Sequence, residues 1–254
     1  MNFKPIKWAC LIGLGMVLFA CNDDEDSVDT GEVVLAFDNV VADQDLVLNT
    51  EVYTNESGEA YKVRELKYIV SNVVFTKKDG STFEITGDNR YHLINEDDRT
   101  SLNYSLSNIP IGEYVSMKIG FGVEQSQWPL KDKADFIPKA EAAGMIWNWT
   151  AGYKFLKFEG AFTAEIEGET VDKDFVIHVG SHGIKLDNYK EIILDIPDTK
   201  VETNERITLA VIMDVAKVFD ATNTMSLATK SDIQVDPENA PLIAENITTA
   251  FSIK

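Results

Sequence analysis

Cysteine is nearly absent from this sequence. The only two copies, Cys10 and Cys21, lie within the first 21 residues. Everything after Cys21 therefore contains no thiol, which excludes an internal disulfide framework, a cysteine-based metal cluster and a thiol nucleophile.

Basic residues are also scarce. The chain has 23 Lys and Arg against 42 Asp and Glu, a net charge of −19. No basic stripe is available for phosphate contacts, so we expect no nucleic-acid partner. A negative surface favours cations as a diffuse field, although much of this charge would serve simply to keep the protein in solution.

Sequence motifs of catalysis are missing as well. The sequence has no GxSxG nucleophile elbow, no GxGxxG, no P-loop and no HExxH. Acids are abundant, but no carboxylate pair stands out from that background as a glycosidase pair. We therefore expect a protein that is not an enzyme.

The N-terminus has the layout of an export signal. Lys4 and Lys7 precede a thirteen-residue apolar run, 8–20, which is too short to span a bilayer comfortably. The run ends in Leu-Phe-Ala-Cys, which resembles a bacterial lipobox. We predict a lipoprotein signal peptide over 1–20 and a lipidated Cys21 that anchors the domain to a membrane. Removal of the signal peptide leaves 21 basic against 42 acidic residues, a net charge of −21.

Acidic residues follow Cys21 directly in the stretch Asn-Asp-Asp-Glu-Asp. This tract resembles the signal with which Bacteroidetes carry lipoproteins to the cell surface. We expect an acidic flexible linker over 21–31 and an outer-membrane lipoprotein exposed on the cell surface, with a periplasm-facing orientation as the alternative. The alternative is an ordinary secreted protein with an incidental Cys21, which we disfavour because the only other cysteine, Cys10, lies inside the removed segment.

Short strand-like runs dominate the rest of the chain. Neither a Pro/Gly/Ser-rich linker nor a repeat of fixed period divides it, so we predict one domain over 32–254. The pattern favours an all-β fold, an antiparallel β-sandwich of immunoglobulin-like or jelly-roll-like type with one or two short helices and long loops. The predicted strands are 33–37, 46–53, 66–75, 82–86, 91–95, 113–123, 154–166, 174–179, 191–196 and 207–215.

Two details of this pattern are specific. Asp79-Gly80 predicts a hairpin between 66–75 and 82–86. In 113–123, strict alternation would place Tyr114, Ser116 and Lys118 on one face and Val115, Met117 and Ile119 on the other. Helical spacing is confined to 131–143, which Pro138 interrupts, and to 239–249, where Asn239 could cap and Pro241 lies in the first turn.

Only three histidines occur. His92 lies in a short predicted strand, whereas His178 and His182 lie in the stretch FVIHVGSHG. Imidazoles at a strand end and in the following turn could share one metal ion. A core histidine with satisfied hydrogen bonds plus an exposed loop histidine explains the same spacing, and on spacing alone we favour it.

Aromatic residues concentrate in the run GMIWNWTAGYKFLKFEG, from Gly144 to Gly160. Trp147 and Trp149 would point to the same face of a strand, because side chains alternate. Two indoles on one face form either a large core patch or the wall of a site.

This run, together with the later histidine–glycine strand FVIHVG, resembles the MbnP-like copper-binding domain family, whose pattern is GMxWxW followed by GYxFxxxEG. Weaker similarities lie at YIVSN, YHLI and IPIGEY, and the resemblance extends from about Val33 to the C-terminus. The stretch EQSQWP from Glu124 departs from the family pattern, which has an acid and an asparagine there.

The resemblance implies an all-β protein outside the cytoplasm that binds copper without catalysis. In such proteins a partner di-haem enzyme oxidises one tryptophan to kynurenine, whose amine joins histidine in binding copper. Trp147 or Trp149 would be that residue, and His178 and His92 the imidazole ligands. Met145 would be a soft neighbour that favours cuprous ion, and His182 a further candidate ligand. For Trp149, core packing is the favoured interpretation.

Two functions of different classes follow. The first is a surface or periplasmic lipoprotein that binds copper for its acquisition or handling. The alternative is a non-enzymatic adhesion, glycan-binding or protein-interaction module whose aromatic residues stack on sugar rings. Metal binding by the purified domain separates the two.

Overall fold

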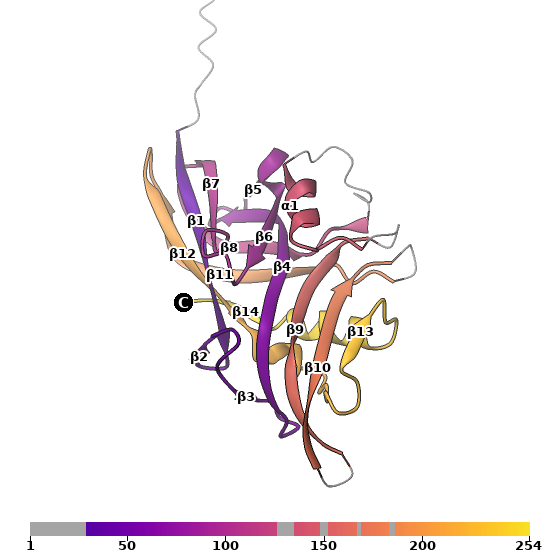
Figure 1. The fold of residues 1–254 in the computed structure, drawn as a ribbon. Helices are drawn as coiled ribbons and strands as arrows, with labels where there is room; N and C mark the ends of the chain where they lie inside the picture. Colours follow the sequence, from indigo (N-terminus) through magenta and orange to yellow (C-terminus); the bar gives the residue numbers. More distant parts are fainter. Residues whose placement is uncertain (1–28, 126–134, 148–151, 167–168, 183–185) are drawn as a thin grey trace, which may run out of the picture.

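The computed structural model describes residues 29–125, 135–147, 152–166, 169–182 and 186–254. Strands dominate the chain (Figure 1), as predicted, and they form two sheets that enclose a hydrophobic core. The all-β, sandwich-like architecture is therefore confirmed.

The first sheet is built on β1 (Thr30–Val41). On one flank β1 pairs with β12 (Arg206–Asp214), which pairs with β14 (Phe251–Ile253). Also paired with β1 are β7 (Asn103–Pro110) and β2 (Gln44–Asp45). Because β1 and β12 run parallel, this sheet is mixed, which the antiparallel prediction missed.

The second sheet has the order β11 (Lys190–Val201), β8 (Gly112–Phe121), β4 (Ala60–Lys77), β9 (Lys154–Ile166), β10 (Glu169–Gly180) and β13 (Asp232–Gln234). Three short strands, β3 (Tyr53–Thr54), β6 (Tyr91–Asn95) and β5 (Thr82–Glu84), also pair with β4. The predicted hairpin is confirmed, since Phe75 of β4 is opposite Phe83 of β5.

The strand β4 is the spine of this sheet. Tyr61 pairs with both β3 and β9, Lys67 with both β6 and β9, and Val74 with both β5 and β8. A strand has only two edges, so β3, β6 and β5 follow one another along one edge, while β9 and β8 share the other. An eighteen-residue strand built around YIVSNVVF is long and apolar enough for this role.

Register shifts explain where strict alternation fails. In β8, Tyr114 is buried and Val115 is 40% exposed, yet Met117 and Ile119 are buried. The pairing of β8 shifts at this point against both β4, at Thr76/Lys77, and β11, between Asp195 and Thr199. The predicted face assignment of Tyr114 and Val115 is therefore wrong, because a bulge reverses the alternation.

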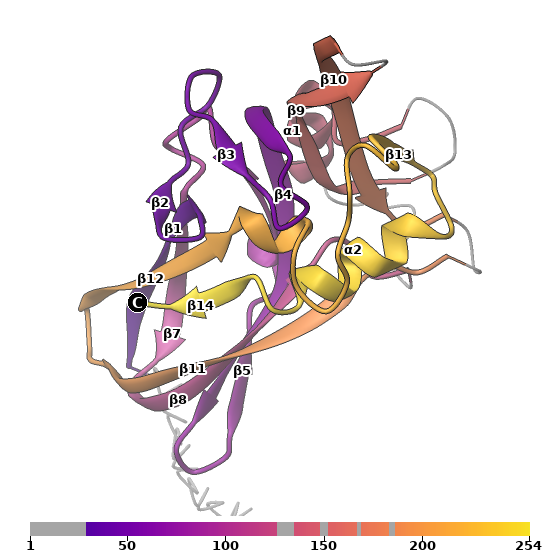
Figure 2. The same ribbon diagram turned by 90° about the horizontal axis from the view of Figure 1, so that it is seen from below.

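The helices are few and short. The helix α1 (Phe136–Ala142) contains Pro138, and α2 (Asn239–Ile247) packs against β10 and β13 (Figure 2). Asn239 does not cap α2. Instead the Asp236 carboxylate accepts hydrogen bonds from the backbone N–H groups of Glu238 and Asn239, at 2.9 Å each. The 3₁₀ turn η1 (Gly87–Arg90) precedes β6, and the 3₁₀ turn η3 (Val215–Val218) follows β12.

Candidate metal centre

The segment that carries Trp147 is fastened to the start of β9. The backbone N–H of Trp147 donates to the carbonyl of Gly152 at 3.1 Å, and that of Lys154 donates to the carbonyl of Met145 at 2.8 Å. Ile146 and Tyr153 form a β-bridge between these two bonds. A short hairpin-like segment therefore holds Trp147, whose side chain is only 6% exposed.

The indole of Trp147 lies against Gly180, the last residue of β10. A Cβ built on Gly180 would lie 2.7 Å from Cζ3 of Trp147 and 2.2 Å from the carbonyl oxygen of Tyr153. Only glycine allows this approach. The glycine of the FVIHVG stretch is thus explained by the packing of the tryptophan.

The ring of His182 packs on the same indole. The two ring centroids are 4.4 Å apart and the planes are inclined at 49°. The Nε1–H of Trp147 is buried and has no hydrogen-bond partner among the described residues. A buried donor without a partner costs about 1–3 kcal/mol, so this atom is a plausible point of contact for a ligand or for a chemical change.

His178 lies two residues before Gly180 on β10, so its side chain shares a face with the position that Trp147 covers. It is 5% exposed. Its Nε2 lies 2.8 Å from Oε1 of Glu159, and its Nδ1 lies 3.1 Å from Oε1 of Gln234. Burial lowers the pKa of His178 despite the hydrogen bond with Glu159, which favours the neutral ring that binds metals.

Charged side chains surround His178 in a row across the sheet. Lys67, Lys157 and His178 occupy neighbouring register positions on β4, β9 and β10. Glu65 contacts both Lys67 and Lys157 at 2.5 Å, and Glu159 lies 3.4 Å from Lys157. We name the set formed by Trp147, His178 and His182 the indole–imidazole cluster, and this polar row forms its border.

His92 belongs to another part of the molecule. Asn95, not His92, shares the cross-strand row with Lys67, Lys157 and His178. His92 lies three positions from Asn95 along β6, so its side chain points to the opposite face of the sheet. Three strand spacings of about 4.8 Å also separate β6, which carries His92, from β10, which carries His178. The structure does not bring His92 and His178 together.

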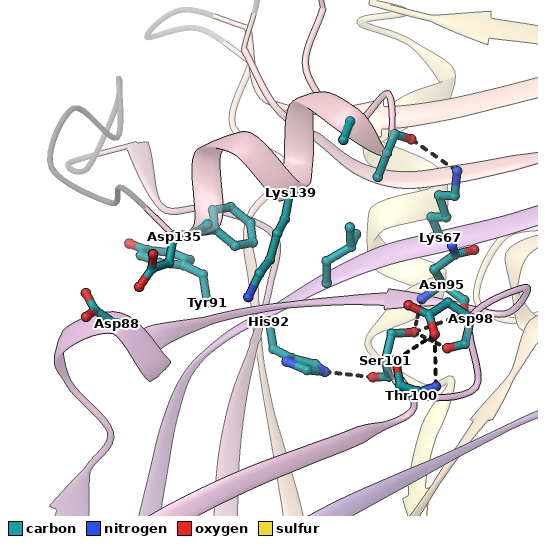
Figure 3. Close-up of a pocket in the computed structure, with 14 residues that line it drawn as sticks. Lys67, Asp88, Tyr91, His92, Asn95, Asp98, Thr100, Ser101, Asp135 and Lys139 are labelled. Atoms are coloured by element: carbon teal, nitrogen blue, oxygen red, sulfur yellow. Dashed lines mark hydrogen bonds between the residues drawn. The ribbon is translucent and has the colours of Figure 1, made fainter.

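The contacts of His92 are structural. Its ring stacks on Tyr104 of β7, with centroids 4.3 Å apart, and its Nε2–H donates to the carbonyl of Ser101 at 2.7 Å. Burial lowers the pKa of His92, so the ring is neutral near pH 7. His92 lines a pocket of about 580 Å³ between β6 and α1, where Lys139 extends over it (Figure 3).

The remaining residues predicted for the site are Met145 and Trp149. Met145 is completely buried and belongs to the hydrophobic core, as do Tyr153 and Phe155. Trp149 lies outside the described residues. Within the described part of the chain, no three His, Cys, Asp or Glu side chains gather as a metal-binding group. Within that part of the chain, a metal at the indole–imidazole cluster would therefore have at most two ligands of these residue types.

Sequence reasoning missed three residues beside this cluster. Glu159 and Gln234 flank the imidazole of His178, and Nζ of Lys154 lies 5.8 Å from the centroid of the Trp147 ring. Glu159 was visible as the Glu of the GYxFxxxEG pattern. Gln234 carried no signal, because β13 reaches His178 only through a parallel pairing 56 residues away.

Two further observations bear on function. The large apolar side chains exposed on the described surface are all aliphatic, so no aromatic platform for a sugar ring is seen there. Among the described residues no helix is long and apolar enough to cross a membrane.

These features define a class, a sandwich-like β protein with a buried indole–imidazole cluster at the end of one hairpin. The family model MbnP matches residues 30–238, and the chain belongs to this family. Its fold is similar to the solved structure "MbnP from Methylosinus trichosporium", with a TM-score of 0.54 and 16% identity over 85% of this chain and 88% of that one. A comparison with curated proteins finds no match.

Proposed function

We propose that this protein binds copper at the indole–imidazole cluster, without catalysis, as a lipoprotein for copper acquisition or handling. One observation carries the proposal: the indole of Trp147 lies over Gly180 and against the ring of His182, beside the strand face that presents His178. Membership of the MbnP family supports it.

The chemistry of the donors suits copper. Imidazole is a good ligand for copper. The chain after Cys21 has no thiolate, and the described residues contain no group of three His, Asp or Glu side chains, which disfavours zinc clusters and hard cations. His178 and His182 would hold the ion. Since both ring nitrogens of His178 have partners, copper would replace either Glu159 or Gln234 at one of them.

Trp147 would complete the site after oxidation. An intact indole is a wall rather than a donor, whereas kynurenine offers an aromatic amine. The buried Nε1–H without a partner among the described residues supports Trp147 as the residue for this change. A di-haem partner protein would supply the oxidation.

Metal titration of the purified domain tests the proposal. We expect stoichiometric cuprous binding under anaerobic conditions, with about tenfold or greater weakening in His178→Ala and in His182→Ala. His92→Ala is the matched control, since His92 lies on the opposite face of the sheet. Absence of binding by the wild type, or equal loss in all three variants, would contradict the proposed site.

Native mass spectrometry tests the tryptophan. The peptide that spans 144–153 should carry the mass change of tryptophan to kynurenine in protein from native cells and not in protein expressed without the partner. A peptide of unmodified mass from native cells would restrict the site to its histidines.

A further inference from the structure

Lys154 places a cation beside the indole–imidazole cluster. Its Nζ donates to the carbonyl of Gly144 at 2.9 Å and lies 5.8 Å from the centroid of the Trp147 ring. Its backbone pairs with Gly180, the residue on which the indole rests. Side chain and main chain therefore both fix Lys154 at the site.

The two neighbouring lysines, Lys67 and Lys157, form ion pairs with glutamates, whereas Lys154 forms none among the described residues. Lys67 and Lys157 both contact Glu65 at 2.5 Å, and Glu159 approaches Lys157. Among the ion pairs of the described residues, none involves Lys154. In a chain of net charge −19, the cluster thus borders three lysines and two glutamates, with the unpaired cation nearest to the indole.

A fixed positive charge discriminates between metal ions by their charge. Coulomb repulsion between an ammonium group and a bound ion is twice as large for a divalent ion as for a monovalent ion at the same position. Burial strengthens the effect, because a half-buried charge is less screened than one in solvent. Lys154 is half-buried.

We propose that Lys154 determines specificity, favouring cuprous over cupric and other divalent ions at the indole–imidazole cluster. This inference rests on the proposed copper function. It assigns Lys154 a role separate from that of the ligands, since the ammonium group repels the ion instead of binding it. Histidine ligands alone would favour the divalent ion.

The affinities of Cu(I) and Cu(II) test this role in wild type, Lys154→Leu and Lys154→Arg. Leucine removes the charge without adding a donor atom for copper, and arginine keeps the charge. We expect Lys154→Leu to tighten Cu(II) binding by about tenfold more than Cu(I) binding. The Cu(II)/Cu(I) potential should fall by about 59 mV for each tenfold change in that ratio. Lys154→Arg should keep the wild-type ratio.

The ratio separates an electrostatic role from a structural one. A variant that merely loosens the hydrogen bond to Gly144 would weaken both ions alike and leave the ratio unchanged, which would overturn the inference. Lys118→Leu is the control, because Lys118 of β8 pairs with Glu191 of β11 at 2.8 Å and its loss should not affect the ratio. A wild type that binds neither ion would overturn the copper function itself, and this inference with it.

Discussion

A glycine decides how Trp147 is held. In β10, Gly180 leaves room for the indole and for the carbonyl of Tyr153. This contact links the tryptophan block of this chain to its histidine–glycine strand. The spacing of the two motifs in the sequence does not reveal it, because the contact is made in three dimensions.

We expect Gly180→Ala to displace the indole and to weaken cuprous binding, because a Cβ there would lie 2.7 Å from the ring. Trp fluorescence and metal titration measure the two effects. Gly160→Ala is the matched control. It also creates a close contact in the β9–β10 hairpin, with Phe175 and the carbonyl of Lys62, but away from Trp147. Equal losses of copper in both variants would contradict the assignment.

The burial of Asp220 leads us to expect that the stability of the folded protein depends on pH. It is 9% exposed, and its Oδ1 has no hydrogen-bond partner among the described residues, so burial raises its pKa. A carboxyl whose pKa is raised on folding destabilises the folded state once it ionises. The penalty is absent below the ordinary pKa of 3.8 and grows as the pH rises through the folded value.

Asp220→Asn should therefore stabilise the protein by about 1 kcal/mol at pH 7 and have little effect near pH 3. The backbone N–H of Glu56, which donates to Asp220 at 2.8 Å, can still donate to the amide oxygen. Denaturant unfolding at the two pH values measures the difference. Asp174→Asn, at an exposed ion pair with Arg64, should show no such pH dependence.

At the scale of elements, α2 is fixed by one buried amide. Asn246 is fully buried; its Oδ1 accepts from the backbone N–H of Asn223 at 2.8 Å, and its Nδ2 donates to the carbonyl of Asn223 at 2.7 Å. These bonds tie the helix to the turn after η3. They provide hydrogen-bond partners for the backbone N–H and carbonyl of Asn223, which lies outside the strands.

Asn246→Ala should lower the free energy of unfolding by about 2–3 kcal/mol, because it leaves both backbone groups of Asn223 without this partner. Leu242→Ala, on the exposed side of the same helix, should cost much less. Thermal and denaturant unfolding give both values. Similar losses in the two variants would contradict the special role of the buried amide.

The positions of the strands could be predicted from the sequence better than the pairing between them. The periodic runs at 91–95 and 154–166 coincide with β6 and β9, because a half-buried strand must alternate. The strand β7 was missed, since NYSLSNIP offers few apolar residues and Asn108 has a positive φ. The parallel pairings of β1 with β12 and of β10 with β13 could not be predicted from the local sequence, because the paired strands lie far apart along the chain.

The same limit applies to the candidate site. Sequence spacing placed Trp147, His178 and His182 among the candidates. The structure places the indole of Trp147 against Gly180 and against the ring of His182, and His178 lies two residues before Gly180 on β10. It separates His92 from them, because the face on which a residue lies depends on register with other strands. Register is a property of the whole sheet and cannot be read from one short strand.

At the scale of the whole molecule, the described chain begins beside two turns. The carbonyl of Thr30 accepts from the backbone N–H of Asn204, and the carbonyl of Asp29 accepts from that of Ile111. The eight-residue step from Cys21 to Asp29 would span up to about 28 Å. The proposed lipid anchor would therefore hold the domain close to a membrane.

Cys21→Ser tests the anchor. We expect the wild type to fractionate with membranes and to incorporate labelled fatty acid, and the variant to incorporate none and to fractionate with soluble protein. Copper binding by the purified domain should not differ between the two. A wild type without incorporated label would show that Cys21 is not acylated.

The arrangement of β4 has a consequence for turnover. Neighbouring strands pair with both edges of β4. A protease could therefore bind the backbone of β4 only after several strands had separated. Degradation should then require opening of the entire second sheet in a single cooperative event. The lifetime of the protein under digestion would be set by that rare opening, and amides along β4 should exchange with deuterium more slowly than those of β14 or β2.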